Sequence, residues 1–288
     1  MKNTNPLITT CPNGCKGTLS DSDLILPEGV LKYCSTCGQL VSQCDEELYI
    51  KSNLKWDTTT GTWPTEKDLK RLKKRRERTI KRISAMLSKG YSDISLLDVG
   101  CSSGAFVWIA QDMGLKAQGV EPAEKPVKKA LELGLKVHQG FLNEIAFPDN
   151  FFDAITLFEV IEHLDKPASL LKECHRILRP GGILVIGTGN TNSWTRRVRG
   201  SRWDFFDLHQ HGGHINFFSN KSISFIATST GFEVKRVRTS SFKLFEKNEL
   251  PYLFYRIFKA FSELLNLPST LLNKGDQMEA YLVSMKDR

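Results

Sequence analysis

The chain has 288 residues, of which 40% are hydrophobic, enough for one large domain with its own core and a small additional module. No apolar run approaches the roughly 20 residues of a membrane-spanning helix, and the amino terminus lacks the basic-then-apolar pattern of a signal peptide. We therefore expect a cytoplasmic protein without a transmembrane segment. The formal net charge of +8 favours an anionic partner without naming one.

Four cysteines near the amino terminus form two short-spaced pairs, Cys11 with Cys15 and Cys34 with Cys37. The segment between the pairs is long enough for a β-hairpin, so that all four thiolates can face one point. Four sulfurs at tetrahedral positions describe a closed structural zinc site, and so short a module would gain much of its folding free energy from the metal. We predict a zinc-ribbon-like module over residues 1–50, in preference to four unrelated thiols.

The other three cysteines do not share this spacing. Cys44 is interpreted as a small apolar residue, and Cys101 and Cys174 as packed thiols. Because the total of seven is odd, a disulfide framework is disfavoured.

A strongly basic segment follows the ribbon. Residues 65–82 open with a Thr65/Asp68 capping pattern and carry ten Lys or Arg residues. The apolar side chains of this segment and of the residue after it form a thin seam: Leu69, Leu72, Ile80 and Ile83. We predict a helix lying on the main domain, within a linker region of residues 51–90. Its charge can attract nucleic acid, an anionic lipid surface or a phosphorylated substrate, although a solvated helix face explains it equally well.

Residues 96–104 read Leu-Leu-Asp-Val-Gly-Cys-Ser-Ser-Gly, a buried strand that runs into a glycine-rich turn. Gly100 and Gly104 let the backbone pass close to a ligand where a helix begins. The next strand ends at Glu121, where a carboxylate can accept both hydroxyls of a ribose. This arrangement indicates a nucleoside-cofactor site.

Apolar strands alternate with helical stretches through this part of the chain, which is typical of a parallel sheet covered on both faces. The strands are predicted at 96–99, 116–120, 136–138, 154–158 and 183–187, with a final pair at 232–239 and 278–285. Helices are predicted at 103–113 and 166–178, and another between a cap at Ser219 and a stop at Gly231.

Several landmarks together resemble the class I S-adenosylmethionine-dependent methyltransferases, especially the ubiquinone-pathway O-methyltransferases. Asp98-Val-Gly100-Cys-Ser102-Ser-Gly104 matches their Asp-x-Gly-x-Gly-x-Gly motif, with Ser102 at the central glycine. Residues 151–163 are similar to their fourth strand and its exit, and residues 179–186 to the turn into their fifth. The resemblance covers roughly residues 90–240.

The resemblance implies an α/β fold with a Rossmann-like, seven-stranded, mostly parallel sheet and an antiparallel final strand. This domain would span residues 91–288, with insertions at 188–218 and 241–275. S-adenosylmethionine is the implied cofactor. The cofactor-binding residues carried over from the resemblance are Asp98, Gly100, Cys101, Ser102, Gly104, Glu121, Pro122, Phe141, Leu142 and Phe158.

Methyl transfer from a sulfonium mainly needs water exclusion and an oriented acceptor, but a hydroxyl acceptor also needs a base. We predict His214 as that base, narrowly ahead of His163, because an insertion over the pocket can reach the acceptor. In resembling enzymes a Glu-x-x-Glu-His set can bind a divalent cation, and Glu159, Glu162 and His163 match it. We slightly favour the interpretation that these three residues shape the pocket without a metal over the interpretation that they bind magnesium.

Two insertions carry further patterns. Residues 202–214 combine aromatic residues with His209, His211 and His214, which suits a loop that stacks on the acceptor; a second zinc site there is less favoured. Residues 250–267 place apolar side chains at helical spacing, which is typical of a core or dimer face and also suits a lipid tail or a bilayer surface. They are Phe254, Ile257, Phe258, Phe261, Leu264 and Leu265.

We therefore expect an enzyme that O-methylates a small-molecule, carbohydrate-linked or lipid-linked anionic acceptor. An RNA methyltransferase is less favoured, because Leu157-Phe-Glu159 stands where enzymes acting on base amino groups have an Asn-Pro-Pro-Tyr type of motif. Nucleotide-sugar C-methyltransferases share the order of modules but carry a further carboxyl-terminal domain. A non-catalytic cofactor-binding scaffold is disfavoured by the retained motif residues.

Overall fold

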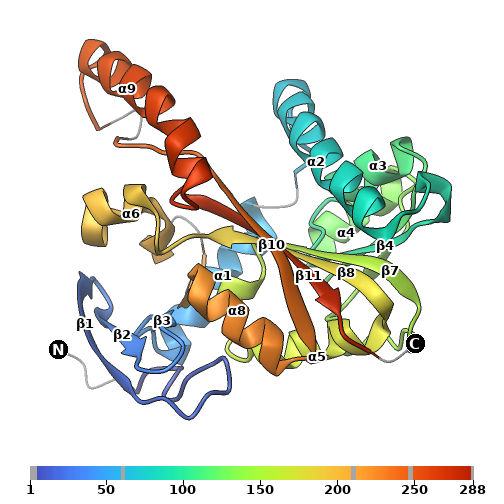
Figure 1. Ribbon diagram of the computed structural model, residues 1–288, viewed down its shortest axis with the longest axis horizontal. Helices are drawn as coiled ribbons and strands as arrows, with labels where there is room; N and C mark the ends of the chain where they lie inside the picture. The colour runs from blue at the N-terminus through green and yellow to red at the C-terminus, as the bar shows by residue number, and fades with distance from the viewer. Residues whose placement is uncertain (1–4, 60–61, 209–211, 246–248, 287–288) are drawn as a thin grey trace.

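The computed structural model describes residues 5–59, 62–208, 212–245 and 249–286. A seven-stranded sheet with helices on both faces forms the body, a four-stranded sheet lies at one side, and helix α9 (Tyr252–Leu271) projects away from the body (Figure 1). None of the helices in these ranges is long and apolar enough to cross a membrane.

The large sheet has the order β10-β11-β8-β7-β4-β5-β6. β11 is antiparallel to both of its neighbours, and the strands from β8 to β6 are parallel to one another. The predicted fold class, with its antiparallel final strand, is confirmed. The strands are β4 (Ser95–Val99), β5 (Lys116–Glu121), β6 (Val137–Gln139), β7 (Phe152–Phe158), β8 (Leu178–Gly189), β10 (Phe232–Ser240) and β11 (Gln277–Ser284).

Two hydrophobic clusters hold helices on opposite faces of this sheet. Ile80 and Ile83 of the basic helix are fully buried in one of them, so the predicted apolar seam is confirmed. This cluster joins α2 (Glu66–Leu87), α3 (Ala105–Asp112) and α4 (Glu124–Glu132) to the sheet. The other cluster joins α5 (Pro167–Ile177) and α8 (Asn220–Ser229).

Side-chain caps fix where two of these helices begin. The Thr65 hydroxyl accepts the Asp68 amide at 3.2 Å at the start of α2, as the sequence pattern predicts. Ser219 and Ser222 form a reciprocal capping box at the start of α8, which confirms Ser219 as the cap.

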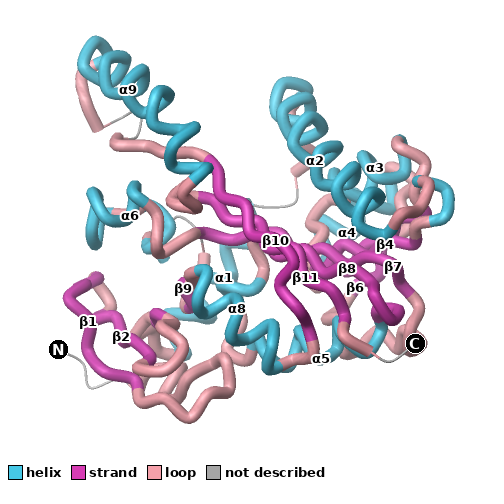
Figure 2. Tube along the Cα trace, viewed as in Figure 1, coloured by secondary structure: helices cyan, strands magenta, loops and turns pink. Residues whose placement is uncertain are grey.

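The amino-terminal hairpin forms part of a four-stranded sheet whose last strand comes from a distant part of the chain. Its strands β1 (Leu19–Leu26), β2 (Gly29–Cys34) and β3 (Leu40–Val41) are joined by β9 (Asn216–Phe217) from the first insertion. Leu40 pairs with Phe217 and Val41 with Asn216. Figure 2 shows β9 on the side of the body where β1 and β2 lie. The ribbon and the insertion therefore form one packed unit, although no sequence periodicity marks two-residue strands.

The remaining elements connect these layers. They are α1 (Glu46–Thr59), α6 (Trp194–Arg199) and the short 3-10 helices η1 (Tyr91–Asp93), η2 (Ile161–His163), η3 (Gly200–Arg202) and η4 (Asp204–Phe206). β4 lies between β5 and β7, so the chain winds in opposite directions on its two sides. In open α/β sheets such a switch point leaves a ligand crevice beyond the carboxyl ends of the strands.

Candidate active site

The glycine turn after β4 lies at this switch point. Gly100, Ser102 and Gly104 have φ angles of +71°, +49° and +80°. A Cβ at Gly100 would lie 2.5 Å from Val160 Cγ2, and one at Gly104 would lie 2.7 Å from Leu135 Cδ1. Glycine is therefore needed at both positions. Ser102 adopts the left-handed conformation that glycine would take there, at a cost of about 1 kcal/mol.

Glu121, the last residue of β5, faces this turn. Its Oε2 accepts the Ser102 amide at 2.9 Å and its Oε1 accepts the Ala123 amide at 3.0 Å. The carboxylate is buried, and these two bonds fix its orientation. A carboxylate oxygen has two lone pairs, so it can accept a hydrogen bond from a ligand hydroxyl as well as from a backbone amide.

Asp98, the fourth residue of β4, is buried beneath the turn. Thr156 donates to its Oδ1 at 2.6 Å. Burial raises the pKa of Asp98 to about 7, although Thr156 and the cationic Arg76 oppose the increase. A further positive charge brought into the cleft would favour the ionised carboxylate.

Arg76 is a residue of this cleft that sequence reasoning missed. It projects from α2 and is only 7% exposed, with its guanidinium carbon 3.2 Å from the centroid of the Phe158 ring. Its Nη1 lies 3.4 Å from a carboxyl oxygen of Glu279 on β11. Burial lowers the pKa of Arg76 to about 10, so it is still a cation at neutral pH.

The other predicted cofactor residues differ in exposure. Cys101 is buried against β5, where a Cβ at Gly119 would lie 2.4 Å from its sulfur. Leu142 is buried in the core, whereas Phe141 and Pro122 are exposed at the rim. The turn, Asp98, Glu121 and Phe158 are thus gathered at the carboxyl ends of the strands, and Leu142 faces the core.

A second polar cluster follows β7. Glu162 is fully buried, and burial together with the nearby Glu159 carboxylate raises the pKa of Glu162 well above its usual range. His214 is also buried, with Nδ1 3.0 Å from the Phe205 carbonyl oxygen and Nε2 4.0 Å from Glu162 Oε1. Potential ligand atoms of Glu159, Glu162 and His214 all lie within 4.8 Å of one another.

This geometry differs from the predicted Glu159, Glu162 and His163 set. His214 is the third member, and the His163 ring lies beside it with ring centroids 4.6 Å apart. Glu162 and His163 are consecutive residues of the 3-10 turn η2, where successive side chains point about 120° apart. His214 instead reaches the carboxylates from the insertion.

The insertion also differs from the predicted open loop. Trp203 and Phe206 are buried in a cluster with ribbon residues such as Leu31, so they are packed instead of available for stacking on an acceptor. His209 and His211 lie outside the described residues, and so does any second zinc site that they would form.

Comparison with known proteins identifies the family. A family model described as "Methyltransferase domain" matches residues 71–237. The chain belongs to this family of methyltransferases. Ubiquinone biosynthesis O-methyltransferase of Pseudomonas paraeruginosa is 31% identical over 110 residues, which cover 36% of this chain and 47% of the relative. The corresponding protein of Yersinia pestis is 30% identical over 125 residues, covering 40% and 52%. The chain thus spans about half the length of the curated relatives it matches.

Solved structures agree on the fold. S-adenosylmethionine-dependent methyltransferases from Thermotoga maritima and Archaeoglobus fulgidus both align with TM-scores of 0.52, at 20% and 18% identity. The first alignment covers 82% of this chain and 100% of that structure, and the second covers 73% and 94%. Together with the family match, these structures show that the chain has the fold of the class I S-adenosylmethionine-dependent methyltransferases.

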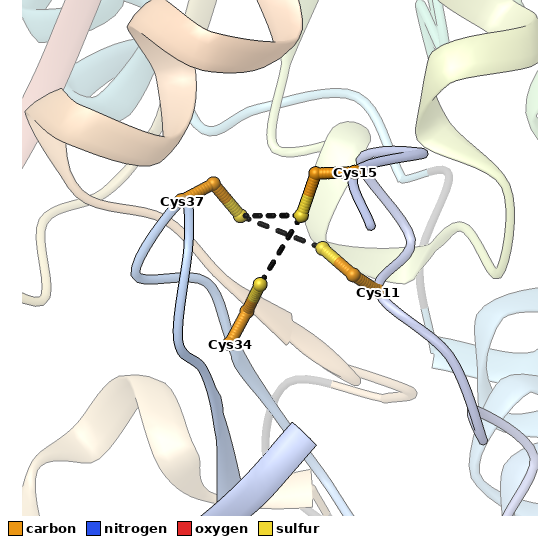
Figure 3. Close-up of side chains that lie close together, drawn as sticks. All are labelled: Cys11, Cys15, Cys34 and Cys37. Carbon is orange, nitrogen blue, oxygen red and sulfur yellow. Dashed lines mark hydrogen bonds between the residues drawn. The ribbon is translucent and has the colours of Figure 1, made fainter. Parts of the chain in front are cut away.

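The methyltransferase carries its four paired cysteines around one point. The Sγ atoms of Cys11 and Cys37 are 3.4 Å apart, those of Cys15 and Cys34 3.2 Å, and those of Cys15 and Cys37 3.7 Å (Figure 3). Zinc–sulfur bonds of about 2.3 Å in a tetrahedron place sulfurs about 3.8 Å apart. The cluster therefore fits a closed four-thiolate site, and the hairpin between its two halves is confirmed.

A chain of hydrogen bonds connects the ribbon to the two histidines. The Ser42 amide, next to β3, donates to the Ile215 carbonyl at 2.9 Å, and the Ile215 amide donates to the Glu162 carbonyl at 3.0 Å. The Tyr49 hydroxyl donates to the His163 carbonyl at 2.6 Å. The ribbon thus supports the backbone on both sides of the polar cluster.

Proposed function

We propose that this methyltransferase transfers a methyl group to a hydroxyl oxygen of a small-molecule, carbohydrate-linked or lipid-linked acceptor, with His214 as general base. The observation that carries the proposal is the buried His214 ring fixed on the Phe205 carbonyl beside Glu159 and Glu162. The ubiquinone O-methyltransferases among the relatives support a hydroxyl acceptor.

The base assignment follows from how the ring is held. A hydrogen bond to the Phe205 carbonyl requires a proton on Nδ1 of His214, which leaves the lone pair of the neutral ring on Nε2. That nitrogen lies 4.0 Å from Glu162 Oε1, in the same cluster as Glu159, and the Glu159 carboxylate can stabilise the imidazolium that forms when His214 takes the acceptor proton.

The cofactor supplies an activated methyl group on a sulfonium sulfur. We propose that Glu121 accepts the two ribose hydroxyls and that the motif turn, from Asp98 to Gly104, lies against the nucleoside. We add Arg76 to the cofactor-binding residues that the sequence predicts. A buried guanidinium in this cleft is suited to the α-carboxylate at the methionine end of the cofactor, because arginine binds carboxylates through charge-assisted hydrogen bonds.

A divalent cation is the alternative to a histidine base. Glu159, Glu162 and His214 would hold it, and carboxylate oxygens suit magnesium. The buried Glu162 would first have to lose the proton that its raised pKa retains, which disfavours this alternative.

We further propose that the ribbon of residues 1–50 binds one structural zinc ion through Cys11, Cys15, Cys34 and Cys37. A four-thiolate site needs reduced cysteines, and this requirement supports a cytoplasmic location.

The acceptor is found by incubating the enzyme with radiolabelled S-adenosylmethionine and fractionated lipids, glycans, metabolites and RNA. Label in a hydroxyl-bearing small molecule, glycan or lipid supports the proposal, whereas label confined to RNA would replace it with the RNA methyltransferase alternative. With that acceptor, His214→Gln should lower turnover about 100-fold while cofactor binding is retained.

Two controls complete this test. His175→Gln on α5, which packs against Phe232, should turn over normally. The wild-type rate should fall in acid as the base becomes protonated. Activity that requires added magnesium, together with a Glu159→Gln variant that is as inactive as His214→Gln, would replace the base proposal with the metal alternative.

A further inference from the structure

Helix α9 turns its apolar stripe away from the protein. Ser262 and Ser269 are its buried residues and face the body. The large apolar side chains lie on another side and are each more than half exposed: Phe254, Ile257, Phe261, Leu264 and Leu271. They recur at spacings of three, four and seven residues and thus form a continuous stripe. A surface helix ordinarily has the opposite orientation, with its apolar stripe in the core.

The base of α9 is held firmly against α6 and its neighbours. The Asn266 side chain accepts the Phe242 amide at 2.6 Å, and the Thr195 hydroxyl accepts the Lys243 amide at 3.1 Å. Trp194 contacts Phe242 edge to face, with centroids 6.2 Å apart. Figure 1 shows α9 extending from the body on the same side as α6. We call α6 to η3, residues 241–245 and α9 the docking lobe.

The docking lobe is strongly basic. Its described residues include the basic side chains Arg196, Arg197, Arg199, Arg202, Lys243, Arg256 and Lys259. The only acid among them is Glu263, and Arg199 is also paired with the adjacent Glu249. Arg197 and Arg202 are exposed, as are Arg256 and Lys259 on the helix itself.

We propose that the docking lobe binds the surface of an anionic lipid bilayer, with the apolar stripe of α9 inserted among the head groups and the basic residues paired with lipid phosphates. An exposed apolar stripe flanked by Arg and Lys is the pattern by which helices lie in a membrane interface. Because Arg256, Lys259 and Glu263 lie along α9, the helix rests on the membrane and does not cross it.

Charge decides between a bilayer and a second copy of this chain. A twofold dimer through the same lobe would place its exposed basic residues against a second set of the same residues; they are Arg197, Arg202, Lys243, Arg256 and Lys259. Like charges across an interface oppose association, whereas an anionic surface neutralises them. An anionic bilayer can therefore bury the apolar stripe of α9 and also neutralise the basic residues beside it.

The test is flotation of the full-length protein with phosphatidylcholine vesicles that contain about 30% phosphatidylglycerol, and with pure phosphatidylcholine vesicles. Wild-type protein should float with the anionic vesicles, and its binding should weaken about tenfold in the neutral ones and in about 0.5 M salt. The triple variant Phe254→Ser, Ile257→Ser and Phe261→Ser should lose at least about tenfold in binding.

A matched triple variant controls for the loss of exposed apolar surface elsewhere. Ile25→Ser, Leu131→Ser and Leu133→Ser replace exposed side chains on the ribbon and around α4, and should leave binding unchanged. Wild-type protein that fails to float, or an α9 variant that floats normally, overturns the proposal. A wild-type dimer by light scattering that becomes monomeric in the α9 variant, without vesicle binding, assigns the stripe to self-association instead and also overturns it.

Discussion

Replacing Glu121 tests the proposed cofactor site most directly. Two charge-assisted hydrogen bonds to ribose hydroxyls are worth roughly 1.5 to 3 kcal/mol each, or about 3 to 6 kcal/mol before water replaces part of them. Glu121→Ala should therefore weaken binding of S-adenosylhomocysteine at least about tenfold, which corresponds to about 1.4 kcal/mol. Titration calorimetry on the folded protein measures this affinity.

The same carboxylate also has a structural role, which the experiment must separate from binding. Glu121→Ala leaves the Ser102 and Ala123 amides without their acceptor, at about 1 to 3 kcal/mol each when buried, so the melting temperature should fall. Glu121→Gln keeps a carbonyl for one of these amides and should melt between the wild type and the alanine variant while still binding weakly. The exposed Glu132→Ala on α4 is the matched control. Wild-type affinity in Glu121→Gln, with only the melting temperature changed, would refute the ribose assignment.

Three further predictions concern the ribbon, the buried arginine and the sheet. Metal analysis should find about one zinc per chain, and a chelator should unfold the ribbon while cofactor binding survives; metal-free protein purified under reducing conditions would contradict this. Arg76→Met should keep the apolar packing of α2 but raise the cofactor Kd about tenfold, whereas unchanged calorimetry would leave Arg76 a structural residue. Burial alone would raise the pKa of Asp153, but hydrogen bonds from Lys89, Ser95 and Arg179 hold it below its usual range. Asp153→Asn should therefore cost about 3 kcal/mol at neutral pH, and the difference from wild type should shrink as the pH falls below about 4, because the Asp153 carboxylate of the unfolded chain then binds a proton while that of the folded wild type stays ionised. Chemical denaturation across pH measures it, and a difference independent of pH would contradict the charge argument.

Local patterns predicted the elements whose formation depends on neighbouring residues. The apolar strand before Gly100, the cap at Ser219 and the hairpin between Cys15 and Cys34 each follow from a few adjacent side chains. The two-residue pairing of β3 with β9 left no such pattern, because its partners are separated by most of the chain. Long-range contacts of this kind are decided by tertiary packing.

The candidate site was predictable to a similar extent. The motif turn and Glu121 are gathered as the resemblance implies, while the third member of the acidic cluster is His214 and not His163. Arg76 was not singled out because it is one of ten basic residues between positions 65 and 82, and the composition of this segment is that of a solvated helix face. Its spacing of four residues before Ile80 places it on the buried seam, and this signal could have singled it out.

The pairing of β3 with β9 has a consequence for how this enzyme can change over evolution. Strand β3 of the ribbon, which follows the four paired cysteines, is hydrogen-bonded together with Ser42 to the insertion that bears His214. A ribbon taken from another protein would have to restore this register before His214 could regain its position. Selection for a new acceptor therefore acts on the amino-terminal ribbon as well as on the insertion that bears His214, and these two parts of the chain are expected to be inherited together.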